Sequence, residues 1–259
     1  MPRFAANLTL LFNEHDFLDR FEPAAKAGFE GVEYLFPYAW EAETLARHLT
    51  GNGLQQVLFN LPPGDWEAGE RGVACHPGRE SEFRRGVEQA LAYADRLGCR
   101  QMNCLAGLVP ESSDPSQCWD TLLANLAWAA DALASEGCDL MVEAINSRVD
   151  MPGFFLDRCE RVVAALDAID RPNAYLQLDL YHQQIQAGDL IRTFERYRDR
   201  IGHIQFADNP GRHEPGTGEI HFPRVFEAID AAGYRGWVSA EYRPSGSTEA
   251  SLETWLSRP

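Results

Sequence analysis

The chain has 259 residues, 45% of them apolar, and a formal net charge of −16. Its length and apolar content fit one large globular domain with a full hydrophobic core. The acidic balance argues against nucleic acid and anionic membrane surfaces as partners, because both would repel it. An anionic substrate would therefore need arginines placed locally at its binding site.

The six cysteines are spread along the chain, and none forms a C-x-x-C pair. A chain of this length does not need a disulfide framework, so we expect buried thiols in a reducing cytoplasm. No apolar run approaches the roughly 18 residues of a membrane-spanning helix. We therefore expect a cytoplasmic protein with no membrane partner, and the sequence leaves a homo-oligomer open.

Strand and helix patterns alternate along the chain. Period-two runs predict strands at residues 4–10, 31–36, 55–60, 101–105, 139–143, 174–182, 201–207 and 236–242. Helical spacing and glycine stops predict helices at residues 15–27, 41–49, 80–97, 115–135, 156–168, 181–197, 222–232 and 248–256, with an interruption near Gly188. Residues 61–80 form a long irregular segment, which is usually functional or mobile in a compact domain.

Eight strand–helix units in about 250 residues predict an α/β fold, a single-domain (β/α)8 TIM barrel over residues 1–259. An open, doubly wound sheet is the alternative. That fold would favour a glycine-rich nucleotide turn after the first strand, and residues 7–12 contain no glycine.

Four consecutive strands carry a polar, oxygen-bearing side chain at their C-terminal ends: Glu143, Asp179, Gln205 and Glu241. Each has an ordinary explanation when taken alone, such as a helix cap, an ion pair or a core amide. In a barrel, however, the strand ends meet at one mouth, where three carboxylates would repel one another unless a cation neutralises them.

An all-oxygen set of this kind favours Mg²⁺ or Mn²⁺ over zinc. His182 and His203 also face inward, which keeps zinc, cobalt or nickel open as alternatives; both histidines could equally bind substrate. A metal flanked by glutamates indicates proton transfer beside a polarised carbonyl. One of Glu143 and Glu241 would remove a carbon-bound proton, and the other would return a proton at the neighbouring carbon.

Three segments carry longer motifs: FNLPPGDWEAGERG at 59–72, LDLYH at 178–182 and QFADNPGRHEPGTGEI at 205–220. They resemble the hydroxypyruvate isomerase family of xylose-isomerase-like barrels. The resemblance covers nearly the whole chain. It implies a metal-dependent isomerase that interconverts hydroxypyruvate and tartronate semialdehyde, with a small 2-keto acid as substrate.

The same resemblance implies that Glu143, Asp179, Gln205 and Glu241 are metal ligands, and that Glu143 and Glu241 are also the acid–base pair. A related group acts on 2-oxo-tetronates and is the alternative substrate class. The chain departs from the family after the fifth strand, where it has Ala144 in place of proline and one additional residue before Pro152. This departure lies next to the substrate contacts that the resemblance implies.

Further residues of the expected mouth are candidates for substrate binding. Arg71 and Arg212 are expected to hold a substrate carboxylate, His182 to donate a hydrogen bond, and Asn60 and Trp66 to contribute to a lid. Each of these also has a structural explanation, as a surface ion pair or a packed loop. Two other functions compete: a metal-dependent phosphodiesterase or endonuclease on the same barrel, and a non-catalytic sugar-acid binder.

Overall fold

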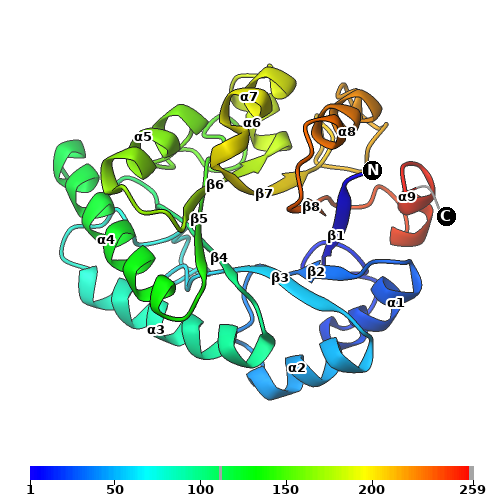
Figure 1. The fold of residues 1–259 in the computed structure, drawn as a ribbon, viewed down its shortest axis with the longest axis horizontal. Helices are drawn as coiled ribbons and strands as arrows, with labels where there is room; N and C mark the ends of the chain where they lie inside the picture. Colours follow the sequence, from blue (N-terminus) through cyan, green and yellow to red (C-terminus); the bar gives the residue numbers. More distant parts are fainter. Residues whose placement is uncertain (111–112, 257–259) are drawn as a thin grey trace.

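A computed structural model describes residues 1–110 and 113–256 and shows a closed barrel of eight parallel strands (Figure 1). The strands follow one another around the barrel in chain order, and β8 pairs with β1 to close it. Their bounds are β1 (Arg3–Asn7), β2 (Gly31–Glu33), β3 (Gln55–Asn60), β4 (Gln101–Cys104), β5 (Asp139–Glu143), β6 (Ala174–Asp179), β7 (Ile201–Phe206) and β8 (Trp237–Ala240). The predicted (β/α)8 fold is confirmed.

Helices connect the strands and form the outer layer of the barrel (Figure 1). They are η1 (Phe17–Arg20), α1 (Phe21–Lys26), α2 (Ala42–Gly51), α3 (Glu80–Leu97), α4 (Pro115–Ser135), α5 (Cys159–Ile169), α6 (Leu180–Gln186), α7 (Leu190–Tyr197), η2 (Arg198–Arg200), α8 (Phe222–Ala231) and α9 (Thr248–Glu253). Within the described part of the chain, no helix has both the length and the apolar character needed to cross a membrane.

Of two predicted helices with unusual features, one differs from the observed structure and the other agrees with it. The single helix expected over residues 15–27 is instead the 3₁₀ turn η1 followed by the short helix α1. Pro23 gives the reason, because proline fits the first turn of an α-helix and would disrupt the interior of a longer one. The interruption expected near Gly188 is confirmed: Gly188 and Asp189 both adopt left-handed backbone conformations, with φ of 67° and 53°, and separate α6 from α7.

The alternation within β6 separates two apolar layers. Leu176 and Leu178 face outward into the large core between the strands and the helices. Tyr175 faces inward and packs against a small cluster inside the barrel, which is formed by Ala5, Val57, Leu58, Met141 and Trp237. These inward residues precede the polar strand ends, so the cluster plugs the N-terminal end of the barrel and leaves the C-terminal end to polar side chains.

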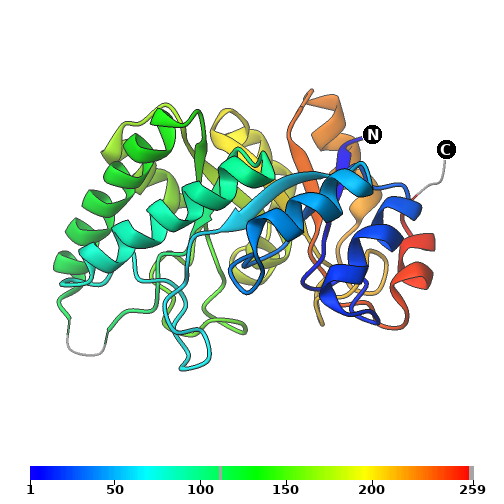
Figure 2. The same cartoon turned by 90° about the horizontal axis from the view of Figure 1, so that it is seen from below.

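The long loop between β3 and α3 extends below the layer of helices in Figure 2. Its base is held by backbone hydrogen bonds from Leu61 to Asn103 and from Cys75 to Ala106, both 2.8 Å long. Gly72 has a φ of 107°, and a Cβ at this position would lie 2.2 Å from the carbonyl oxygen of Leu105. The loop is therefore attached closely to the strand ends rather than loosely tethered.

The glycine at position 202 gives a test of the inner plug. A Cβ there would lie 2.6 Å from the sulfur of Met141 and 2.8 Å from the Cβ of Tyr175. Because overpacking a filled core typically costs about 1–3 kcal/mol, we expect Gly202→Ala to lower the free energy of unfolding by about that amount in urea denaturation. Gly51→Ala is the control, since a Cβ at Gly51 meets nothing within 4 Å; an equal loss in both variants would contradict this packing.

Candidate active site at the barrel mouth

Three acidic side chains converge at the C-terminal mouth of the barrel. Glu143 ends β5, Asp179 ends β6, and Glu241 directly follows β8. All three are buried, with exposures between 2% and 5%. The backbone N–H of Glu241 donates to the carbonyl of Phe206, which extends the β7–β8 pairing by one residue.

The pKa values of these acids are raised. For Glu143, burial and then the charges of Glu241 and Asp179 raise the pKa well above its usual value. For Asp179, burial raises the pKa although Arg212 acts in the opposite direction. Burial raises the pKa of Glu241 to about 8, again against the effect of Arg212. A cluster of this kind carries its full negative charge only when positive charge is supplied nearby.

Arg212 supplies part of that charge. One guanidinium nitrogen, Nη2, lies 2.7 Å from Glu241 and 3.6 Å from Asp179, and Nη1 lies 3.8 Å from Asp150. The guanidinium also stands 5.1 Å from the ring of Tyr181. Its Nε–H is buried and finds no hydrogen-bond acceptor among the described residues. The Nε–H of Arg212 is therefore available to donate a hydrogen bond to a ligand in the mouth.

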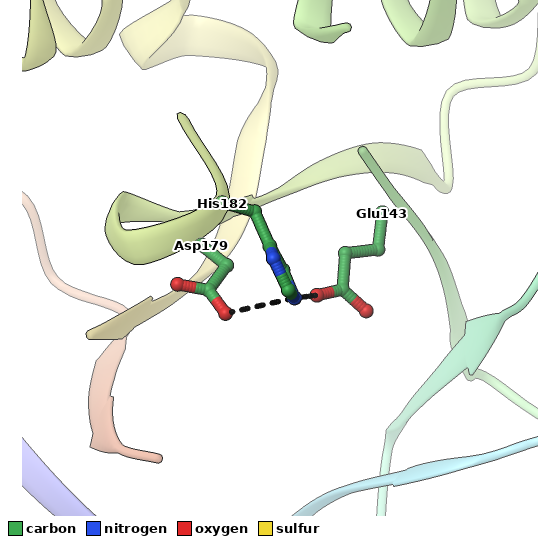
Figure 3. A group of neighbouring side chains, drawn as sticks. All are labelled: Glu143, Asp179 and His182. Carbon is green, nitrogen blue, oxygen red and sulfur yellow. Dashed lines mark ion pairs between the residues drawn. The ribbon is translucent and has the colours of Figure 1, made fainter. Parts of the chain in front are cut away.

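His182 lies between two of the acids, as Figure 3 shows. Its Nε2 is 3.5 Å from Oδ2 of Asp179 and 3.8 Å from Oε1 of Glu143. One ligand atom from each of these three residues lies within 4.8 Å of the others, so the group has the spacing to hold a metal ion. Burial, followed by the charge of Arg212, lowers the pKa of His182 well below its usual value, so the ring is neutral.

Asn146 determines which nitrogen of His182 carries the proton. Its side-chain oxygen accepts the backbone N–H groups of Val149 and Asp150, so its amide nitrogen must point the other way. That nitrogen lies 2.7 Å from Nδ1 of His182 and donates to it. The neutral ring therefore holds its proton on Nε2, directed at the acids, and acts there as a hydrogen-bond donor.

Gln205 lies opposite Asp179 in the β6–β7 pairing and is held on both sides of its amide. Its Nε2 donates to Glu33 at 2.7 Å, and its Oε1 accepts from Gln177 at 2.6 Å. His203 is turned away from the acids toward Glu33, with its Nε2 at 2.7 Å. Gln205 is thus an oriented amide next to the mouth, and His203 belongs to the layer beneath it.

The other predicted substrate residues lie in different surroundings. Asn60 is buried at the end of β3, where its oxygen accepts from Asn103, and Asn103 also donates to Oε2 of Glu143. Arg71 stacks 3.9 Å over the ring of Trp66 and donates to backbone carbonyls of its own loop. Asn60 is therefore linked to the acids through Asn103, whereas Arg71 and Trp66 form a pair within the β3–α3 loop.

Some site residues carried little signal in the sequence. Asn146 and Asp150 follow the end of β5, where period-two alternation no longer applies, and Asn7 reads as one polar residue within a strand. Period-two alternation is the only sequence signal that could place Asn7, Glu33 and Asn103 in the barrel interior, and it does not indicate their roles. Their roles depend on partners more than 20 residues away, such as Glu241 for Asn7.

The donor set fits a divalent cation. Oδ1 of Asp179 accepts the backbone N–H of Tyr181 and caps α6, so the helix-cap explanation is correct for that oxygen. Oδ2 is buried and has no hydrogen-bond partner in the described part of the chain. A buried carboxylate oxygen without a donor, in a group of acids with raised pKa values, is the environment expected of a metal ligand.

The loop between β7 and α8 carries Arg212 and is organised around Asp208. Both carboxylate oxygens of Asp208 accept backbone N–H groups at 2.9–3.0 Å, which come from Asn209, Gly216, Gly218 and Ile220. The backbone N–H of Arg212 donates to the Asp208 carbonyl, and Arg212 has a φ of 58°. Asp208 thus sets the loop shape that brings Arg212 to the acids.

Comparisons with known proteins agree with this geometry. Residues 21–258 match the protein-family model for the xylose isomerase-like TIM barrel. The hydroxypyruvate isomerase of Escherichia coli K12 is 48% identical over 256 residues, which cover 99% of this chain and 98% of that protein. The 2-oxo-tetronate isomerase of Cupriavidus necator is 49% identical over 256 residues, with the same shares of the two chains.

A crystal structure described as an AP endonuclease, family 2, from Brucella melitensis has a TM-score of 0.96 and 49% identity, and the match covers 98% of both chains. A 3-keto-D-glucoside 4-epimerase from E. coli, at 18% identity and a TM-score of 0.82, shares the fold. The family resemblance predicted from the three sequence motifs is confirmed.

Asp208→Asn tests the loop scaffold. An amide offers one oxygen where the carboxylate offered two, so two of the four backbone N–H groups would face a donor. We expect amide hydrogen exchange across residues 209–220 to become at least tenfold faster, which mass spectrometry would measure. Glu219→Gln is the matched control, because Glu219 lies exposed in the same loop and accepts only side-chain hydrogen bonds. Unchanged exchange in Asp208→Asn would show that the loop is held by other contacts.

Proposed function

The chain belongs to the xylose isomerase-like TIM barrel family and is an isomerase, and we propose that it interconverts hydroxypyruvate and tartronate semialdehyde by metal-dependent proton transfer. The observation that carries the proposal is the cluster of buried acids with raised pKa values around one unpartnered oxygen of Asp179. Such a cluster is costly for stability alone, and it suits a reaction in which carboxylates bind a cation and exchange protons.

We propose that Glu143, Asp179, Gln205 and Glu241 hold the ion. Three carboxylates and one amide form a hard oxygen set, which favours Mg²⁺ or Mn²⁺. His182 meets the spacing for a fifth or alternative ligand. Its Nε2 proton argues for a different role, since a ligating nitrogen must present a lone pair. When bound, the ion would polarise the substrate carbonyl as a Lewis acid.

The two glutamates have the surroundings of a proton-transfer pair. Glu143 accepts from Asn103 on Oε2, and Glu241 accepts from Asn7 on Oε1 and from Arg212 on Oε2. One glutamate takes the proton from the hydroxyl-bearing carbon, which leaves an enediolate, and the other delivers a proton to the neighbouring carbon. The hydroxyl proton passes from the first oxygen to the former carbonyl oxygen, which completes the isomerisation. Burial raises the pKa of both groups, and that of Glu241, at about 8, lies close to the neutral pH at which it must accept and release protons.

His182 and Arg212 fit the oxygen atoms of the substrate. The Nε2–H of His182 points between Asp179 and Glu143, where it can donate to a substrate oxygen that gains negative charge. The Nε–H of Arg212 is buried and unpaired within the described residues. A substrate carboxylate would provide the acceptor that this donor lacks, and a local arginine would offset the net charge of the chain.

Arg71, Asn60 and Trp66 have weaker support as substrate contacts. Arg71 already stacks on Trp66 and donates hydrogen bonds to two backbone carbonyls. It therefore stabilises the loop, either alone or in addition to binding substrate. Asn60 reaches Glu143 only through Asn103. We retain these three residues as candidates for the rim of the site rather than as the main contacts of the carboxylate.

The same machinery would serve a 2-oxo-tetronate, and relatives at nearly equal identity bear both names. The description of the Brucella melitensis structure names an endonuclease, but the net charge of −16 disfavours a nucleic-acid backbone as substrate of this chain. All six cysteines are buried free thiols, which supports our placement of the protein in the cytoplasm.

Metal removal tests the proposal directly. We expect chelation to abolish isomerisation of hydroxypyruvate, and Mg²⁺ or Mn²⁺ to restore it more fully than Zn²⁺, because the donor set is all oxygen. The assay follows tartronate semialdehyde formation and is run beside an identical series with a 2-oxo-tetronate. Full activity in the chelated protein would contradict the metal dependence, and turnover of the 2-oxo-tetronate alone would reassign the substrate.

The roles of the glutamates are tested by proton exchange. We expect Glu143→Gln and Glu241→Gln each to reduce exchange of the substrate C–H with solvent deuterium by at least about 10²-fold, the usual scale of general acid–base catalysis. Proton NMR measures the exchange, and Mn²⁺ binding is measured on the same samples to separate lost chemistry from lost metal. Glu136→Gln, at an exposed position after α4, serves as the control. Wild-type exchange in either site variant would refute its assigned role.

A further inference from the structure

A fourth buried acid lies directly beneath the mouth and takes no part in the proposed chemistry. Glu33, at the end of β2, is 1% exposed. Three donors converge on its carboxylate: Nε2 of His203 at 2.7 Å, Nε2 of Gln205 at 2.7 Å and Nδ2 of Asn7 at 2.9 Å. The barrel thus gathers donors from β1 and β7 around one acceptor.

Two of these donors belong to or contact the proposed ion ligands. Gln205 is itself a proposed ligand. Asn7 uses the same amide nitrogen to donate to Oε1 of Glu241, at 3.1 Å. The side-chain oxygen of Asn7 accepts the backbone N–H of Thr9, which keeps its amide nitrogen directed at the two carboxylates. Glu33 therefore contacts one ligand directly and a second ligand through Asn7.

We propose that Glu33 is the positioning residue of the ion site, because it turns the amide of Gln205 so that the oxygen, and not the nitrogen, is the atom available to a cation. This inference rests on the proposed function, since it assumes that Gln205 and Glu241 bind the ion. The two ends of an amide are nearly equal in size, so their orientation depends on the hydrogen-bond partners.

A carboxylate is the partner that decides this orientation, because it only accepts hydrogen bonds. With Glu33 in place, the nitrogen of Gln205 must face it and the oxygen must face away. Gln177 donates to that oxygen and occupies one of its two lone pairs, which leaves the other for an ion. Partners of this kind behind metal ligands typically affect metal affinity by 10- to 100-fold.

The contacts of Glu33 allow its role as a hydrogen-bond acceptor to be separated from the role of its negative charge. His203 faces one oxygen of Glu33, while Gln205 and Asn7 share the other. In Glu33→Gln the remaining oxygen can stay with Gln205 and Asn7. The new amide can then donate to His203, whose Nδ1 is buried without a partner in the described residues and can take over the ring proton. In Glu33→Met no acceptor remains.

The experiment is a Mn²⁺ titration of the full-length protein without substrate, followed by the electron paramagnetic resonance of free Mn²⁺, with a thermal melt of each sample. We expect Glu33→Met to bind Mn²⁺ 10- to 100-fold more weakly than wild type, and Glu33→Gln to remain within about threefold of wild type on the same principle. If the charge alone mattered, the two variants would lose affinity equally. If Glu33 only stabilised the barrel, Glu33→Met would melt earlier but bind Mn²⁺ normally. Either result overturns the proposal.

Should Glu33→Met not fold, Glu33→Asp takes its place. Aspartate keeps the charge but withdraws the acceptor by one methylene from Gln205 and Asn7, so we expect weaker Mn²⁺ binding than in Glu33→Gln. The reverse order would overturn the proposal, as would the failure of all three variants to fold. A wild-type protein that binds no Mn²⁺ would refute the proposed ion site itself, whereas normal binding in every variant would refute only the role of Glu33.

Discussion

The burial of three carboxylates at one end of the barrel is the constraint that the rest of the structure has to meet. Glu143, Asp179 and Glu241 are nearly inaccessible to water, and burial is the largest cause of the raised pKa of each. Charges of like sign in such a place destabilise the fold unless donors and cations surround them. Asn103 donates a hydrogen bond to Glu143, and Asn7 and Arg212 donate to Glu241. Oδ2 of Asp179 has no such donor among the described residues.

The barrel meets this constraint by dividing its interior into layers. Apolar side chains such as Met141 and Trp237 fill the N-terminal end, where no charge has to be solvated. Above them lies a polar layer that includes Glu33 and His203, and this layer contacts Gln205, which lies opposite Asp179 at the mouth. The polar layer is joined to the mouth by hydrogen bonds, such as those from Gln205 to Glu33 and from Asn7 to Glu241. The polar interior therefore acts as a rigid support for the mouth, which is where catalytic geometry has to be precise.

The strand ends were predictable because two simple rules act together. Period-two alternation shows which side chains face inward, and parallel strands in a closed barrel bring their C-terminal ends to one mouth. These rules identified Glu143, Asp179, Gln205 and Glu241 from the sequence, and the structure places the three acids close together. The family motifs added the reaction class, which alternation alone does not contain.

The loop residues were not predictable in the same way, because no periodicity applies to them. Arg71 and Arg212 looked alike in the sequence, yet one stacks on Trp66 while the other reaches the acids. The difference depends on the backbone of the β7–α8 loop, with its left-handed Arg212 and its four N–H groups on Asp208. The proton position on His182 likewise depends on Asn146, whose orientation is set by two backbone contacts within its own loop.

Under the proposed function, the choice between the two substrate classes would rest with these loops rather than with the acids. Hydroxypyruvate and a 2-oxo-tetronate present the same carbonyl and neighbouring hydroxyl-bearing carbon, so proton transfer by two glutamates cannot tell them apart. One additional carbon has to be accommodated beyond the reacting atoms, near the residues that border the mouth. Asn146 and Asp150 lie there, in the segment where the chain departs from the family pattern, and both contact the mouth through His182 or Arg212. The additional carbon of a 2-oxo-tetronate carries a hydroxyl group, and a site that hydrogen-bonds this hydroxyl would favour the longer substrate. Contacts from this loop would then set the preferred substrate while the acids stay in place.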